Sequence, residues 1–233
     1  MRLSKRIHKL AETVRQGDTA ADIGTDHGYV PMLLLKNGTS PRVIMSDISE
    51  GSLAKAKETF RLCGLDADPS DFRVGDGLET IEAGEVDEII IGGLGGHTIA
   101  DILDADKDKS RSFSRVVMQP RKHSGALRYW LYTNGWDIES EQLAPEGKFV
   151  CEIISAVPSD TCHREPPYPE DDIRWKYPES LAQADAALAK QRIGWKISSI
   201  NEEIENLLQS GKDQTALISI LHKDLDYLNK LIK

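Results

Sequence analysis

The stretch AADIGTDHGY, residues 20–29, decides the fold that we expect for this chain. An apolar run ends at Asp22, passes through Gly24 and Gly28, and leads into the helix-like residues 30–36. A strand that turns through glycine into a helix places backbone N–H groups around a ligand. The stretch therefore predicts an open α/β sheet with a ligand site at the end of its first strand.

A second acidic residue supports this site. The apolar residues 43–45 lead to Asp47, which lies 23 residues after Gly24 (47 minus 24). At this spacing, an acidic residue at the end of the next strand can hold the hydroxyl groups of a ribose. Asp47 and the adjacent Ile48 therefore predict an adenosine-containing cofactor, and they make ordinary turn glycines the weaker interpretation.

The charge of the first loop indicates which cofactor this is. The dinucleotide pattern G-x-G-x-x-G needs a glycine at its middle position, where this chain has Asp26. A carboxylate there repels a diphosphate but attracts an ammonium or sulfonium group. The loop therefore favours S-adenosylmethionine over NAD.

Composition limits the class of protein. The 233 residues allow one sizeable domain and an appendage. A hydrophobic content of 39% and a mean hydropathy of -0.40 are typical of a soluble protein. No apolar run approaches the roughly 20 residues that span a bilayer, and residues 1–16 lack the apolar core of a signal peptide. The three cysteines Cys63, Cys151 and Cys162 lack metal-type spacing, so we expect free thiols, no bound metal, no membrane contact and a cytoplasmic location.

The charged residues are segregated along the chain. The formal net charge is -9, but residues 1–16 carry five basic side chains against one acidic one, a local balance of +4 (5 minus 1). Such a distribution can present a basic face to phosphates, although solvated helix faces are the alternative. The basic residues expected to contact RNA are Arg2, Lys5, Arg6, Lys9, Arg121, Lys122, Arg128, Lys190, Arg192 and Lys196.

Strand-like and helix-like segments alternate through the first two thirds of the chain. Helices are expected at 4–14, 30–36, 51–63 and 124–133, and strands at 19–23, 43–47, 72–74, 86–91, 115–119, 136–143 and 149–157. The last two strands flank the turn-like residues 145–147 and read as an antiparallel pair. This order predicts a Rossmann-like, doubly wound and mostly parallel sheet that ends in an antiparallel hairpin, the layout of a class I methyltransferase.

The organisation changes at Pro158. Residues 158–178 contain five prolines and read as a surface connector between a cofactor-binding domain, 1–157, and a helical segment, 179–233. The segment after Ser210-Gly211 repeats the helical spacing found before it, which predicts an antiparallel coiled-coil hairpin. Its apolar stripe consists of Ile193, Ile197, Ile200, Ile204, Leu207, Leu217, Leu221, Leu225, Leu228 and Ile232.

The predicted cofactor site collects residues from the ends of the first four strands. Asp76 could accept a hydrogen bond from an adenine amino group, although a plain Asp-Gly turn is the alternative. The expected cofactor-binding residues are Asp22, Gly24, Thr25, Asp26, His27, Gly28, Asp47, Ile48, Asp76, Gly77, Gly92, Gly93 and Leu94.

A glycine-rich loop follows the fourth strand. Residues 92–97 read GGLGGH, where many nucleic-acid amino-methyltransferases have a (D/N)PPY-type motif. Four glycines in five positions leave the backbone bare, so a flat base could lie against it. Turns that need glycine would explain one or two of the four.

Four segments together resemble a known family. They are DIGTDHGYVP (22–31), GDGLETI (75–81), IIIGGLGGHTI (89–99) and MQPRKHSGALRYWLY (118–132). The chain resembles, over nearly its whole length, the bacterial tRNA adenine-N1 methyltransferase family that modifies adenosine 22. This resemblance implies a class I fold, S-adenosylmethionine as methyl donor and tRNA as substrate. The family often has Asn after Gln-Pro where this chain has Arg121, which puts any contact of that residue with the base in doubt.

The implied reaction suggests roles for individual residues. A neutral ring nitrogen needs no strong base, so alignment should supply most of the rate. The methylated base is cationic, and a carboxylate could stabilise it. Asp26 is the candidate, with a role in holding the methionine ammonium group as its alternative. Tyr29 and His97 are candidates for orienting or stacking on the base, although His97 also reads as a helix-start residue.

Two other functions remain open at this point. An NAD-dependent oxidoreductase would share the glycine turn and Asp47, and a non-catalytic protein that binds tRNA or S-adenosylmethionine would share the scaffold. The sequence indicates no obligate protein partner, and the modified position follows from the resemblance alone.

Overall fold

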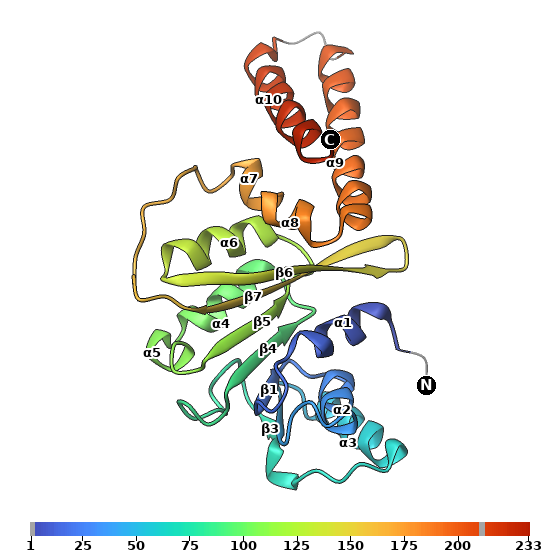
Figure 1. The fold of residues 1–233 in the computed structure, drawn as a ribbon, viewed down its shortest axis with the longest axis vertical. Coiled ribbons are helices and arrows are strands. Elements are labelled where there is room, and N and C mark those ends of the chain that lie inside the picture. The colour runs from blue at the N-terminus through green and yellow to red at the C-terminus, as the bar shows by residue number, and fades with distance from the viewer. Residues whose placement is uncertain (1–2, 210–212) are drawn as a thin grey trace.

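The computed structural model describes residues 3–209 and 213–233, which form a seven-stranded sheet covered by helices on both faces (Figure 1). The strand order is β3-β2-β1-β4-β5-β7-β6. The parallel strands are β1 (Ala20–Ile23), β2 (Val43–Asp47), β3 (Phe72–Val74), β4 (Glu88–Gly92) and β5 (Arg115–Gln119). The antiparallel hairpin consists of β6 (Trp136–Glu146) and β7 (Phe149–Pro158). The predicted fold class is confirmed, and the chain reverses its direction of growth between β1 and β4, where such sheets bind ligands.

Helices lie on both faces because the buried strands are apolar on both sides. Ile89 and Ile91 of β4 pack in the core that contains α4 (Gly96–Asp104) and α6 (Ser124–Thr133), whereas Ile90 packs in the opposite core. That opposite core contains α1 (Lys5–Thr13), α2 (Tyr29–Lys36) and α3 (Glu50–Cys63). Successive side chains of one strand thus point to opposite faces of the sheet, and each face packs in its own core. The short elements η1 (Pro69–Asp71) and α5 (Lys107–Ser110) lie in the connections.

A buried ion pair fixes the end of α1 to the sheet. The guanidinium of Arg115 lies 3.1 Å from Glu88 and donates a hydrogen bond to the carbonyl of Thr13, at the end of α1. Near the other end of the strands, Leu10 meets Gly92. The helix therefore runs against the strand direction, and its amino-terminal end reaches the edge of the sheet where ligands bind.

The β6–β7 hairpin is longer than predicted. Pro145 and Glu146 belong to β6, so the connection is Gly147-Lys148 rather than the predicted turn 145–147. Gly147 has a φ of +58°, the left-handed conformation that two-residue hairpin loops require. The extended hairpin carries Leu143 and Val150 into a core shared with the C-terminal helices.

The last quarter of the chain forms α7 (Ile173–Lys176), α8 (Glu179–Ala184), α9 (Ala186–Gln209) and α10 (Thr215–Leu231), and α9 and α10 project away from the sheet (Figure 1). Part of the predicted connector is packed, because Trp175 of α7 is buried against Tyr129 and Tyr132. The division into domains and the coiled coil stay predictions, and the Ser210-Gly211 turn lies outside the described residues.

The predicted apolar stripe is buried at most of its positions, but Leu217 is 38% exposed, which makes its place in the stripe wrong. The buried members are Ile193, Ile200, Ile204, Leu221, Leu225 and Leu228. No helix in the described part of the chain is long and apolar enough to cross a membrane.

A carboxylate at the centre of β7 joins the helices to the sheet. Glu152 accepts hydrogen bonds from Arg128 of α6 (2.5 Å), from Arg192 of α9 and from Ser124 (3.1 Å). Arg128 is fully buried and also donates to Glu141. The prediction that Arg128 contacts RNA phosphate is therefore wrong, because its guanidinium is enclosed by the protein and paired with two carboxylates.

We expect the change Glu152→Ala to lower the free energy of unfolding by about 3–5 kcal/mol, because it leaves the buried guanidinium of Arg128 and the half-buried one of Arg192 without their shared carboxylate. Urea titration followed by circular dichroism measures this, with Glu203→Ala on the exposed face of α9 as the control. A loss below about 1 kcal/mol, the size of an exposed ion pair, would show that the cluster does not hold the fold together.

Candidate cofactor and substrate site

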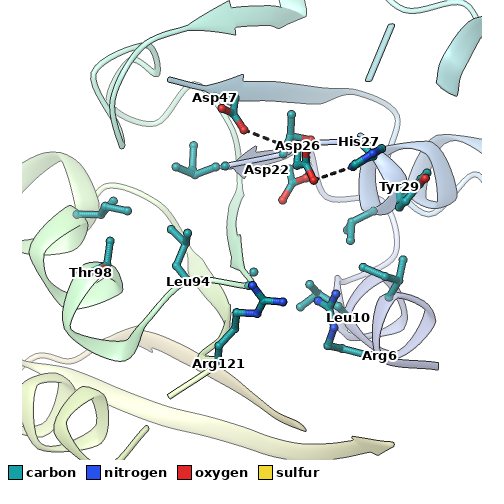
Figure 2. A pocket seen from close by; sticks show the side chains of 18 of the residues that line it. Arg6, Leu10, Asp22, Asp26, His27, Tyr29, Asp47, Leu94, Thr98 and Arg121 are labelled. Atoms are coloured by element: carbon teal, nitrogen blue, oxygen red, sulfur yellow. Dashed lines mark hydrogen bonds and ion pairs between the residues drawn. The ribbon is translucent and has the colours of Figure 1, made fainter. Parts of the chain in front are cut away.

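A cavity of about 720 Å³ lies at the carboxyl ends of β1, β2 and β4, between the loops that follow these strands and helix α1 (Figure 2). Its size falls within the range of sites that bind small molecules. Three carboxylates, those of Asp22, Asp26 and Asp47, lie at one end in Figure 2, and the guanidinium groups of Arg6 and Arg121 lie at the other. The cavity is therefore polarised from acidic to basic.

The loop after β1 adopts the left-handed conformations that its glycines predict. Gly24, Asp26 and Gly28 have φ values of +74°, +44° and +66°. The N–H groups of Gly24 and Thr25 donate to the carbonyl of Ser46, which folds the loop back onto β2. Together these bonds place the side chain of Asp26 at the lip of the cavity.

Gly28 lies outside the cavity lining, which corrects its predicted contact with a cofactor. It precedes α2, and a Cβ atom at this position would lie 2.9 Å from the Cβ of Ala56 in α3. Gly28 therefore allows α2 and α3 to approach each other, which is a packing role.

Asp22 is a buried carboxylate whose only hydrogen-bond partner in the described residues is Thr25. Its side chain accepts the Thr25 hydroxyl at 2.7 Å, and the residue is 5% exposed. Burial raises the pKa of Asp22 to about 6; the Thr25 hydrogen bond opposes this shift, and the negative charge of Asp47 adds to it. Asp22 is therefore a negative site that a ligand cation would stabilise.

Asp47 is held by backbone N–H groups. Its two oxygens accept hydrogen bonds from the amides of Ser49 (2.9 Å) and Asp26 (3.1 Å). A carboxylate has further lone pairs on each oxygen, so Asp47 can still accept hydrogen bonds from a ligand. This arrangement fits the predicted contact with a ribose.

Asp26 is less free than its place in the sequence indicates. Its side chain is 53% exposed, and its oxygens lie 2.6 Å from the His27 ring and 3.1 Å from the Lys55 ammonium group. Partial burial acts to raise the pKa of Asp26, but the bonds from Lys55 and His27 outweigh it and hold this pKa below its ordinary value. His27 in turn stacks on Tyr29 at 5.2 Å, and both rings line the cavity.

Apolar side chains form another wall of the cavity. Ile48 is 71% exposed, and Leu94 and Ile102 line the same cavity together with Asp76 and Gly77. An exposed isoleucine beside a ribose-binding carboxylate offers an apolar surface to a flat ring. Ile102 and Thr98 of α4 were not predicted, because helical spacing alone does not show which residues of a helix reach a cavity.

The glycine-rich loop is explained largely by packing. A Cβ atom at Gly92 would lie 2.8 Å from Leu10, and one at Gly96 would lie 2.2 Å from the carbonyl oxygen of His123. Gly93 has a φ of +83°. Of the four glycines only Gly93 has a left-handed φ, which agrees with the expectation that turns explain one or two of them, whereas Gly92 and Gly96 are explained by close packing. Gly92, Gly93 and Leu94 nevertheless line the cavity.

His97 does not lie in the cavity. It is exposed in the first turn of α4, and its ring contacts that of His123 at 4.6 Å. The catalytic role predicted for His97 is therefore wrong, and its alternative as a helix-start residue agrees with the structure.

Glu146, which was not predicted as a site residue, lies at the basic end of the cavity beside Arg6. Arg6 of α1 donates to Gln119 at 3.0 Å and lies 3.4 Å from Glu146, which is at the end of β6. The backbone N–H of Arg121 donates to the carbonyl of Leu94 at 2.7 Å, and this hydrogen bond fixes the loop that contains Arg121. Glu146 reaches the site only because β6 is longer than predicted. Leu3, Ser4, Ile7 and Leu10 of the N-terminal segment also line the cavity.

The remaining basic residues differ in their freedom. Lys5, Arg121, Lys122 and Lys190 are exposed, and Lys9 and Lys196 are half-buried. Lys9 lies 4.0 Å from Glu12, and Arg192 is paired with Glu152. Arg2 lies outside the described residues.

Comparison with known proteins agrees with this geometry. Residues 3–154 match the family described as methyltransferase domain. The tRNA (adenine(22)-N(1))-methyltransferase of Bacillus subtilis is 38% identical over 160 residues, which cover 69% of this chain and 67% of that protein. The crystal structure of the B. subtilis M1A22 tRNA methyltransferase TrmK is 28% identical, with a TM-score of 0.81 over 100% of this chain and 99% of that chain. The structure of an uncharacterised protein from Listeria monocytogenes is 27% identical, with a TM-score of 0.85 over 100% of both chains.

The family match covers the strands that build the cavity, and the two solved structures match through the C-terminal helices as well. They agree with the resemblance carried by the four sequence segments. The chain belongs to the tRNA (adenine(22)-N(1))-methyltransferase family.

Proposed function

We propose that this protein transfers the methyl group of S-adenosylmethionine to N1 of adenosine 22 in tRNA. The observation that carries the proposal is the polarity of the cavity. Its buried carboxylates suit a cationic methyl donor, and its opposite end opens toward unpaired basic side chains that suit RNA. Family membership supports the same activity.

The residues present fit S-adenosylmethionine. Asp22 is a buried carboxylate with no cation within salt-bridge distance in the described chain, so it is the group we assign to the ammonium of the methionine part. Asp47 would accept the ribose hydroxyls. Ile48 and Leu94 would contact the adenine ring, with Asp76 beside its amino group. Asp26, which is partly neutralised by Lys55, adds negative potential at the lip.

A diphosphate fits the same loop poorly. Asp22 and Asp26 would both face its negative charges, and the basic groups nearby, His27 and Lys55, are already engaged with Asp26. An NAD-dependent oxidoreductase is therefore the weaker alternative.

The basic end of the cavity would hold the target adenine. Bound S-adenosylmethionine supplies a methyl group on a positively charged sulfur, which N1 of adenine can accept without first losing a proton. Leu3 and Ile7 would pack against the base, which limits its orientation. One oxygen of Glu146 is buried without a hydrogen-bond partner in the described chain, so it can accept the adenine amino group and balance the charge of the methylated base. Tyr29 would help to enclose the site.

The RNA itself would contact the surface around this end. The candidates for phosphate contacts are Lys5 and Lys9 of α1, Lys122, and Lys190 and Lys196 of α9. The target base must leave its stack to enter the cavity, and contacts on either side of it would hold the flanking backbone.

We expect the purified protein to transfer about one methyl group from labelled S-adenosylmethionine to an unmodified tRNA transcript, and mass mapping to place it on N1 of adenosine 22. A transcript with guanosine at this position should accept none. Cofactor binding without transfer would favour a non-catalytic binding protein, and heat released on titration with NAD but not with S-adenosylmethionine would favour the oxidoreductase.

Cofactor affinity should depend on pH through Asp22. The pKa of the free carboxyl is about 6, and a cationic ligand binds its ionised form, so affinity should be constant above about pH 7 and fall roughly tenfold per pH unit below 6. Calorimetry with S-adenosylmethionine across this range measures the effect. The Asp22→Asn variant should bind about 10- to 100-fold more weakly at neutral pH and lose the pH dependence. Equal wild-type affinity at pH 5 and pH 7.5 would exclude Asp22 as the ammonium ligand.

A further inference from the structure

A second cavity lies beside the first. It has a volume of about 570 Å³ and is lined by residues from the loop 120–123, the end of the β6–β7 hairpin, α7 and α9. The two cavities share Arg6, Arg121 and Glu146 as a common wall. A polymeric ligand with one unit in the basic end of the first cavity would therefore have its neighbouring unit at the second cavity.

Basic side chains dominate this second cavity. Of its two acidic residues, Glu152 holds Arg128 and Arg192, and Glu146 lies beside Arg6 through one of its oxygens. The basic side chains that line it are those of Arg6, Arg121, Lys122, His123, Lys176 and Arg192.

Three of these side chains have no anionic partner. Within residues 3–209 and 213–233, no salt bridge or side-chain hydrogen bond involves Arg121, Lys122 or Lys176. The Lys176 ammonium group lies over the Tyr177 ring, 6.0 Å from its centroid. This contact leaves the N–H donors of Lys176 without an acceptor in the described part of the chain. Unfilled donors that converge on one cavity indicate an anionic ligand.

The fold brings Lys176 to this place through a close approach of two helices. A Cβ atom at Gly125, near the start of α6, would lie 3.2 Å from the backbone nitrogen of Lys176. The end of α7 thus lies on the start of α6, beside His123. The start of α6 has no side-chain cap, so its dipole adds positive potential to the cavity.

Burial, and to a smaller extent neighbouring positive charge, lowers the pKa of two side chains in this cavity. Burial lowers the pKa of His123, and the charges of His97, Lys122 and Lys176 lower it further. Burial also lowers the pKa of Lys176, with a smaller effect from Lys196. An anion in the cavity would relieve this repulsion.

We propose that the second cavity binds a backbone phosphate of the tRNA directly next to the target nucleotide, with Lys122 and Lys176 as its ligands. This inference rests on the proposed function, since it takes tRNA as the substrate. The two cavities share a wall, so when the target base occupies the first cavity, the phosphodiester that joins this nucleotide to its neighbour would lie at the second. A phosphodiester is therefore the anion that we expect there. Lys176 lies in the predicted connector, so charge patterning alone did not single it out.

The double variant Lys122→Gln/Lys176→Gln tests this assignment. We expect its KM for tRNA to rise about tenfold and the slope of log affinity against log salt to become smaller by about one per lysine, while affinity for S-adenosylmethionine stays the same. The double change to Arg keeps the charge and should restore most of the tRNA affinity. The control Lys36→Gln/Lys223→Gln removes the same charge from exposed positions elsewhere and should leave the KM within about twofold.

Ethylation interference locates the phosphate. With the wild-type protein, ethylation of a phosphate adjacent to adenosine 22 should block binding, and with the Gln double variant this block should disappear. An unchanged KM and salt slope in the double variant would overturn the inference, as would the same interference pattern in both proteins. Either outcome leaves methylation by the wild-type protein intact, so failure here is distinct from failure of the proposed function.

Discussion

The buried carboxylate of Glu152 is the contact on which the arrangement of the C-terminal helices depends. It receives Arg128 from α6 and Arg192 from α9, and Arg128 is also paired with Glu141. Burial lowers the pKa of Arg192 to about 10, with a further contribution from the charge of Arg128, so the Arg192 guanidinium remains charged at neutral pH. One anion thus fixes two cations, and with them the angle at which α9 leaves the sheet.

The regular part of the fold was predictable because its signal is local. Apolar runs, helical spacing and glycine turns locate most elements to within a residue or two. Arg128 was misread because its partners lie 13 and 24 residues away, and nothing in its own neighbourhood marks it as buried. Gly96 was misread for the same reason, since the carbonyl that excludes a side chain there belongs to His123 in another loop.

In the candidate site, too, the sequence does not show which charged side chains pair with each other. The sequence locates Asp22 and Asp26 on one loop but cannot show which of them is free to meet a ligand. In the structure Lys55, 29 residues after Asp26, partly neutralises it, whereas Asp22 is buried with no cation from residues 3–209 or 213–233 beside it. The preference for a positively charged cofactor therefore survives, but the residue that best explains it is Asp22.

The protein is acidic overall, and yet its site must hold both a cation and a polyanion. The structure resolves this by separating charge across two adjoining cavities: carboxylates gather at the ends of β1 and β2, while Arg6, Arg121 and Lys122 line the second cavity. The Glu146–Arg6 contact lies at the boundary. Because the carboxylates lie at one end of the first cavity and the guanidinium groups at the other (Figure 2), a small cation and a large RNA are drawn to different parts of the site and meet where their reacting atoms must be adjacent.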